Sequence, residues 1–150
     1  GSLPAYHPRA MPPSARAVVE RFLRDGYDRS ARLWRMDVIA ECFDVDRYVS
    51  HTWGGGLAET GRRMAEFWSA FEREPEALAD ALVADGDRVV HLVSWRGTHV
   101  GPVLGVEATG RTVEIHHVEM WRVEDGRIVE HWGGMGEAAH LFAQISPSSG

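Results

Sequence analysis

The sequence predicts an α+β fold in which helices gather on one face of a curved antiparallel sheet. Amphipathic helical patterns fill the first half of the 150-residue chain, and long strand-like runs fill the second half. Asp-Gly pairs at positions 85 and 125 separate these runs, and an Asp-Gly pair between apolar segments is a strong hairpin signal. Helices followed by an antiparallel meander are typical of an α+β domain.

Three helices are predicted before the sheet. The first begins after Ser14, a residue suited to cap a helix, and ends at Gly26. A second, shorter helix is predicted over residues 37–43, and a third over residues 59–75, where a proline ends the helical pattern. The apolar stripe of the third helix consists of Met64, Phe67, Trp68 and Phe71.

Four strands and a closing helix are predicted in the second half. The strands are expected over residues 78–83, 88–97, 111–123 and 127–132. A short helix is expected over residues 137–145. The chain therefore reads as a flexible arm (1–13), one domain (14–145) and a tail (146–150), since 150 residues suit a single core.

The charge and composition of the chain favour small-molecule chemistry. The formal net charge is −6, whereas nucleic acids and anionic membranes are bound by clustered positive charge. All 16 positive side chains are arginines, so a lysine Schiff base, covalent pyridoxal phosphate and a lysine-dependent phosphate loop are excluded. A single cysteine excludes an internal disulfide. No apolar run is long enough for a membrane span and no signal peptide is evident, so we expect a cytoplasmic protein.

The strand predicted over residues 111–123 carries polar groups within apolar surroundings. Its odd positions are Val113, Ile115, His117, Glu119 and Trp121, and its even positions are Glu114, His116, Val118, Met120 and Arg122. Successive side chains of a strand point to opposite faces, so both faces contain apolar residues. One face is expected to meet the helices. The other is expected to be covered by a second copy of the sheet, which predicts a homodimer.

Several motifs resemble a known family. They are Tyr-Val-Ser-His at 48–51, Arg-Gly-Thr-His-Val-Gly at 96–101, Thr-Gly-Arg-Thr-Val at 109–113 and Arg-Val-Glu-Asp-Gly-Arg-Ile-Val-Glu-His-Trp at 122–132. Over residues 15–141 the chain resembles the SnoaL-like polyketide and ester cyclases of the nuclear-transport-factor-2-like superfamily. The resemblance implies a cone-shaped α+β barrel with a deep apolar pocket between helices and sheet. Members close rings by aldol chemistry without a cofactor, and relatives isomerise, dehydrate, open epoxides or only bind ligands.

One departure from the family concerns its acid–base residue. The resemblance implies an aspartate directly after the His-Trp of the last strand, and this chain has Gly133 there. Either the chemistry has moved to other residues or it is lost.

The replacement residues that we predict are Glu119, His117, His131 and His51. Glu119 and His117 share a strand face about 7 Å apart, and His131 lies within cross-strand reach on the next strand. A carboxylate beside an imidazole suits proton abstraction next to a carbonyl. The alternative is that Glu119 forms a buried ion pair with Arg96 or Arg122.

The wall of the pocket is expected to be aromatic. The predicted substrate-binding residues are Trp53, Trp68, Trp95, Trp121, His91 and Phe67. A metal site formed by His51, His117, Glu119 and His131 is geometrically conceivable. Acid–base or ligand-binding roles are the preferred interpretation, so no metal and no cofactor are predicted.

These observations predict a cofactor-independent enzyme that cyclises, dehydrates or isomerises a small apolar or aromatic carbonyl compound by acid–base catalysis. The alternative is a binding module that holds a metabolite in the same pocket without transforming it. The position of Glu119 discriminates between them: a hydrogen bond to a histidine at an open pocket supports the enzyme.

Overall fold

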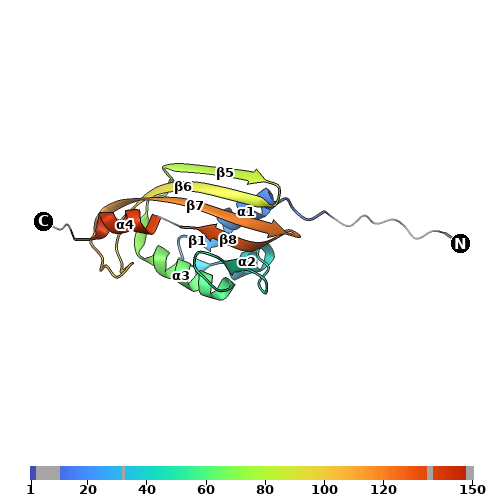
Figure 1. Ribbon diagram of the computed structural model, residues 1–150, viewed down its shortest axis with the longest axis horizontal. Coiled ribbons are helices and arrows are strands. Elements are labelled where there is room, and N and C mark those ends of the chain that lie inside the picture. The colour runs from blue at the N-terminus through green and yellow to red at the C-terminus, as the bar shows by residue number, and fades with distance from the viewer. Residues whose placement is uncertain (3–10, 32, 135–136, 148–150) are drawn as a thin grey trace.

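The computed structural model describes residues 1–2, 11–31, 33–134 and 137–147. Its helices are α1 (Ala15–Asp25), α2 (Met36–Cys42), α3 (Leu57–Ser69) and α4 (Glu137–Ile145). Its strands are β1 (Tyr27–Asp28), β2 (Leu33–Trp34), β3 (Val49–Ser50), β4 (Phe71–Arg73), β5 (Ala79–Asp85), β6 (Arg88–His99), β7 (Thr112–Glu124) and β8 (Arg127–Gly133). The predicted α+β class is confirmed: helices pack on a curved sheet that does not close (Figure 1). Most of the predicted arm lies outside the described residues.

The six-stranded sheet is built around the two longest strands. Its order is β3-β8-β7-β6-β4, and β5 also pairs with β6. All pairs are antiparallel except the short pair of β3 and β8, which is parallel. The predicted hairpin at Asp125 is confirmed, because Asp125 and Gly126 have φ values of 51° and 76° and join β7 to β8. Positive φ at both central residues is the requirement of a type I′ turn.

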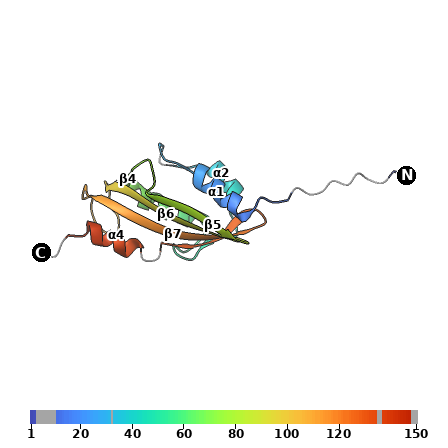
Figure 2. The same cartoon turned by 90° about the horizontal axis from the view of Figure 1, so that it is seen from above.

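Helix α1 forms where its cap and its apolar spacing agree. Ser14 Oγ accepts a hydrogen bond from Ala17 N at 3.2 Å, and Val18 and Val19 are buried against the sheet. The helix ends at Asp25, and the N–H of the following Gly26 still donates to the carbonyl of Phe22. Helices α1 and α2 lie over one face of the sheet, whereas α4 lies at the opposite end, beside β7 (Figure 2).

The third helix is shorter than predicted. It ends at Ser69, and Phe71–Arg73 forms strand β4 instead of continuing the helix to Pro75. The reason is pairing with a distant strand, since Phe71 lies opposite His99 and Arg73 opposite Gly97 on β6. Strand β6 accordingly extends to His99, beyond the predicted end at residue 97.

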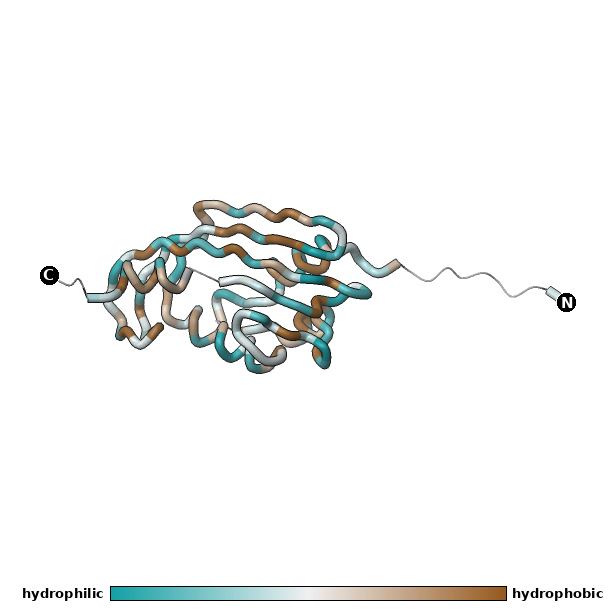
Figure 3. The backbone as a smooth tube through the Cα atoms, viewed as in Figure 1, coloured by the Kyte–Doolittle hydropathy of each residue, from teal (hydrophilic) through white to brown (hydrophobic). Residues whose placement is uncertain are grey.

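The interior contains two apolar clusters with polar residues between them. One cluster joins α1 and α2 to the end of the sheet near the β7–β8 turn and includes Trp121 and Val123. The other joins α4 and β4 to the opposite end, where β7 begins, and includes Val113 and Ile115. Burial of each large apolar side chain contributes about 1.5–3 kcal/mol. Apolar and polar segments alternate along the long strands in Figure 3. The odd positions of β7 face the interior, so His117 and Glu119 fall between the clusters.

In the described parts of the chain, no helix combines the length and apolar character that crossing a membrane requires.

Candidate functional site

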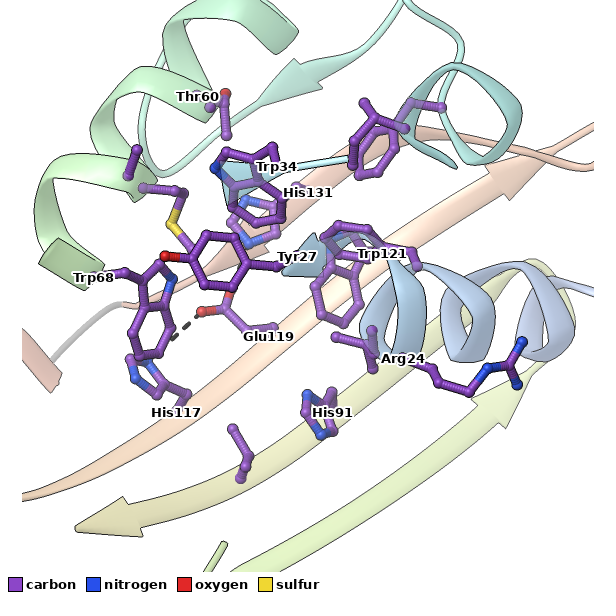
Figure 4. A pocket seen from close by; sticks show the side chains of 18 of the residues that line it. Arg24, Tyr27, Trp34, Thr60, Trp68, His91, His117, Glu119, Trp121 and His131 are labelled. Atoms are coloured by element: carbon purple, nitrogen blue, oxygen red, sulfur yellow. Dashed lines mark hydrogen bonds and ion pairs between the residues drawn. The ribbon is translucent and has the colours of Figure 1, made fainter. Parts of the chain in front are cut away.

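A large pocket lies between the helices and the inner face of the sheet. Its volume is about 1260 Å³. Aromatic rings make up much of its wall, namely Phe22, Tyr27, Trp34, Phe43, Tyr48, Trp53, Trp68, Trp95 and Trp121. In Figure 4 the carboxylate of Glu119 lies at the centre, with Trp68 on one side and Trp121 on the other. Such a wall suits a planar ligand of several rings.

The carboxylate of Glu119 is held by a chain of hydrogen bonds that starts on β3. Glu119 Oε2 bonds to Nε2 of His131, and Nδ1 of His131 lies 2.9 Å from Ser50 Oγ. Ser50 Oγ also accepts a hydrogen bond from Trp53 N at 3.0 Å, which leaves its proton available for His131 Nδ1. A neutral His131 that donates from Nε2 to Glu119 satisfies every member of this chain.

The second histidine of the site is neutral. His117 Nδ1 lies 3.9 Å from Glu119 Oε1, outside hydrogen-bonding distance. Burial, reinforced by the positive charge of Arg73, lowers the pKa of His117 to about 4. The ring is enclosed by Phe67, Trp68 and Trp95, whose centroids lie 5.4–6.1 Å away. An uncharged imidazole therefore stands beside the carboxylate at physiological pH.

Gly133 gives the Glu119 carboxylate its space. The two residues are directly opposite each other on β8 and β7. A Cβ atom at position 133 would overlap the carboxylate, lying 2.7 Å from Glu119 Cδ and 2.9 Å from the carbonyl oxygen of Val118. The backbone of Gly133 is fixed by a hydrogen bond from its N–H to Thr52 Oγ1 at 2.8 Å. The carboxylate thus occupies the place of a side chain at position 133.

Most of the residues predicted for the site are brought together in the pocket. Its wall includes Glu119, His117, His131, His91, Trp53, Trp68, Trp95 and Trp121. His91 Nε2 lies 2.7 Å from Asp80 Oδ1 on β5. Phe67 is not part of the pocket wall and instead packs behind it against His117 and Trp68.

His51 is directed away from the other predicted residues. Its ring stacks on Trp132 with centroids 4.8 Å apart, and its Nε2 lies 2.8 Å from Glu130 Oε2. The residue is exposed, and it is not part of the pocket wall.

The alternative ion pairs of Glu119 do not form. Arg96 pairs with Glu114, and Arg122 pairs with Glu130 and with Glu124. The members of these pairs on β7 are Glu114, Arg122 and Glu124, which occupy even positions on the outer face of the sheet. Glu119 is instead bonded to a histidine at an open pocket.

Sequence reasoning missed two residues that the motif at 48–51 contains. Tyr48 and Ser50 are 4% and 1% exposed and point inward, whereas Val49 and His51 point outward. Burial raises the pKa of the Tyr48 hydroxyl well above its usual value, and the nearby Glu119 carboxylate raises it further. The period-2 alternation of a strand could have identified this pair if residues 48–51 had been read as extended. Tyr27, Trp34 and Arg73 also line the pocket and carried no sequence signal.

Histidines and acidic residues share the pocket wall, and both are residue types that bind metal ions. Among the described residues, no three His, Cys, Asp or Glu side chains are arranged to hold a metal ion. His51, one of the four residues that could have formed such a site, lies outside the pocket.

The curved sheet, its helical cover and a deep aromatic pocket with buried titratable groups define a class of small-molecule-binding α+β proteins. The sequence matches the SnoaL-like polyketide cyclases over residues 17–145. The chain therefore belongs to the SnoaL-like polyketide cyclase family, whose members act on small-molecule substrates. No curated protein matches the sequence significantly.

Solved structures share the fold at low sequence identity. A candidate SnoaL-like polyketide cyclase from Jannaschia sp. CCS1 has a TM-score of 0.70 and 21% identity, with 95% of this chain and 99% of that chain covered. TsrD from Streptomyces laurentii has a TM-score of 0.66 and 22% identity, with 87% and 96% covered. IdmH from Streptomyces antibioticus, a candidate polyketide cyclase, has a TM-score of 0.61 and 24% identity, with 89% and 99% covered. At these identities the likeness shows the fold.

Proposed function

We propose that this protein cyclises, dehydrates or isomerises a polyketide-like carbonyl compound by proton transfer, without a cofactor. The observation that carries the proposal is the carboxylate of Glu119, held by His131 on the wall of an aromatic pocket, beside a neutral His117. A positioned carboxylate beside uncharged hydrogen-bonding groups is suited to general acid–base catalysis.

In the proposed reaction Glu119 removes a proton from the carbon next to the substrate carbonyl. The electron pair moves onto the carbonyl oxygen, and that oxyanion accepts a hydrogen bond from His117 or from the Tyr48 hydroxyl. Both groups are neutral donors at physiological pH, because burial lowers the pKa of the imidazole and raises that of the phenol. The enolate then attacks a second carbonyl, expels hydroxide or is reprotonated elsewhere. Protonated Glu119 returns the proton in each case.

The position of Glu119 also accounts for the glycine at position 133. The family resemblance implies an acid–base aspartate there, on the strand next to β7. Because the carboxylate of Glu119 fills the space of a side chain at Gly133, we propose that Glu119 replaces that aspartate from the neighbouring strand. His131 and Ser50 act as positioning residues, since they contact Glu119 directly or through one another.

Substitution of Glu119 by glutamine tests the proposal. The probe is 2-acetonaphthone, a planar aromatic ketone, and the measurement is exchange of its α-protons in D₂O followed by NMR. We expect the native protein to accelerate exchange and Glu119→Gln to reduce that acceleration on the order of 100-fold to 10,000-fold. Glutamine keeps the shape of the side chain and cannot take the proton.

The matched control is Glu114→Gln, which removes a carboxylate from the same strand on the outer face. Its exchange rate should equal that of the native protein. Full exchange activity in Glu119→Gln would remove Glu119 from the mechanism. Binding of the ketone to the native protein without exchange would favour the binding-module alternative.

We also propose that the protein is a homodimer formed through the outer face of β5 and β6. Val83 and Leu92 are 64% and 46% exposed on this face, and Ala81 lies directly opposite Leu92. β5 is an edge strand of seven residues. A second copy is the proposed partner, because it offers the same apolar patch together with an edge strand of the same length.

A further inference from the structure

Arg73 stands out among the arginines of this chain. It lines the pocket and is partly buried, with its Cζ atom 4.0 Å from the centre of the Trp68 ring and 5.6 Å from the centre of the Trp95 ring. Within the described residues its guanidinium has neither a hydrogen bond nor an ion pair. Arg96 and Arg122, by contrast, both pair with carboxylates on the outer face.

The fold directs Arg73 into the pocket. β4 places Arg73 opposite Gly97 of β6, two residues beyond Trp95 on the same inner face. A Cβ atom at Gly97 would lie 2.9 Å from the Trp95 ring and 3.3 Å from Arg73 Cα. Glycine at this position therefore leaves room for the indole ring beside the arginine.

The guanidinium is charged, and no residue in the described part of the chain accepts a hydrogen bond from it. Burial lowers the pKa of Arg73 to about 10, and the charge of Arg29 contributes in the same direction, so the group remains protonated at neutral pH. Removing an unpaired charge from water costs free energy, and the two indole rings offset only part of that cost. A planar guanidinium with free donors is suited to bind a carboxylate with two parallel hydrogen bonds.

Arg73 lies well apart from Glu119 in the pocket. Their opposite residues on β6 are Gly97 and His91, so their backbones are about 20 Å apart along the strand at about 3.3 Å per residue. Their side chains converge: the Trp68 ring lies 4.0 Å from Arg73 Cζ and 5.4 Å from the His117 ring, and His117 Nδ1 lies 3.9 Å from Glu119 Oε1. The pocket wall between them consists of Trp95, Val93, His117 and Trp68. A ligand that reached both residues would be long, flat and apolar in its middle.

We propose that Arg73 binds the carboxylate of an elongated, planar, apolar carboxylic acid whose reactive carbon lies at Glu119. The carboxylate site follows from Arg73 and its surroundings alone, whereas placing the reactive carbon rests on the proposed function of Glu119. Arg73 is a substrate-binding residue in this assignment and takes no part in proton transfer.

The test compares an acid with its neutral analogue. The probes are 2-naphthoate and 2-naphthamide, and their dissociation constants are measured by calorimetry at pH 7.5 and 150 mM NaCl. We expect the native protein to bind naphthoate at least tenfold more tightly than naphthamide, because a charge-assisted bidentate contact is stronger than a neutral one. Arg73→Met should bind both probes equally. Arg73→Gln provides a second, polar replacement in case the methionine variant does not fold.

Arg88→Met is the matched control. Arg88 also lies over an indole ring, 5.4 Å from the centre of Trp132, but it is exposed and outside the pocket wall. This variant should keep the native preference for naphthoate. Equal binding of the two probes by the native protein, binding of neither at millimolar concentration, or an unchanged preference in the Arg73 variants would each overturn the proposal.

The same measurement on Glu119→Gln separates the carboxylate site from the chemistry. A retained preference for naphthoate in a variant without α-proton exchange would support both proposals. If the native protein shows no exchange and yet prefers naphthoate through Arg73, the carboxylate site stands while the proposed acid–base function fails.

Discussion

His117 illustrates how burial sets the chemistry of a single residue. Its pKa in the folded protein is about 4, against about 6.5 for an unperturbed histidine. Between these two values the unfolded chain binds a proton that the folded protein does not bind. Stability therefore rises with pH across this window and is lost as the pH falls from about 6.5 toward 4.

Replacement of His117 by phenylalanine should reduce this dependence on pH. The variant keeps an aromatic ring between Phe67, Trp68 and Trp95 and removes the titrating group. Between pH 7.5 and pH 5 we expect the native protein to lose about 2 kcal/mol more unfolding free energy than the variant. Urea unfolding at the two pH values measures the difference. His116→Phe, at an exposed position on the other face of β7, should behave like the native protein.

The sequence was sufficient to predict which side chains of β7 share a face. It was not sufficient to predict which side chains around β3 point inward. Strict alternation in a long strand places His117 and Glu119 on one face, and the structure has them there. At 48–51 the chemical type of His51 suggested a role. The inward side chains are instead Tyr48 and Ser50, because β3 pairs with β8 in a register that places Ser50 opposite His131. A two-residue strand has too little pattern to reveal that register.

Among the secondary-structure elements, α4 protects an exposed edge of the sheet. Among the residues that the structure describes, β8 pairs with β7 only from Glu119 onward, so no described strand lies beside the start of β7 on that side. Gln144 of α4 fills the gap. Its Oε1 accepts a hydrogen bond from Glu114 N at 2.9 Å, and its Nε2 donates to Glu114 O at 2.8 Å. A side-chain amide here takes the place of a neighbouring strand.

Removal of this amide should loosen the start of β7. We expect Gln144→Ala to lower the free energy of unfolding by about 1–2 kcal/mol, because a partly buried N–H and carbonyl lose their partners. Hydrogen exchange of the Glu114 amide should increase with it. Phe142→Ala, at an exposed position of the same helix, should leave that amide unchanged. Unaltered exchange at Glu114 in the Gln144 variant would show that the edge is protected by other contacts.

The end of α3 shows where local patterns lose predictive power. The apolar spacing of Phe67, Trp68 and Phe71 fits a helix through residue 71, yet the helix ends at Ser69. Phe71 is buried as the pattern requires, but it belongs to β4 and pairs with His99, far along the chain. Hairpin turns and long amphipathic helices are encoded locally and were predicted. Short strands depend on distant partners and were not.

At the scale of the whole molecule, a substitution that introduces one charge into the proposed interface tests the dimer. Leu92→Glu places a carboxylate in the centre of the apolar patch of β5 and β6. We expect light scattering after size exclusion to give the mass of two chains for the native protein and of one chain for the variant. Leu33→Glu, a change at a 64% exposed leucine on β2, should remain a dimer. A native mass of one chain at high protein concentration would contradict the proposal.

The close approach of Glu119 and Gly133 constrains how sequences of this kind can diverge. A side chain longer than glycine at position 133 overlaps the carboxylate, so a single substitution there is disfavoured while Glu119 is present. A shorter residue at position 119 removes the overlap with the carboxylate, but the carbonyl oxygen of Val118 would still lie 2.9 Å from a Cβ atom at position 133, so the backbone must shift as well. The two positions are therefore coupled: a side chain at position 133 requires that the Glu119 carboxylate move or be shortened and that the backbone at Val118 shift, so an acid on one strand disfavours an acid opposite it on the other.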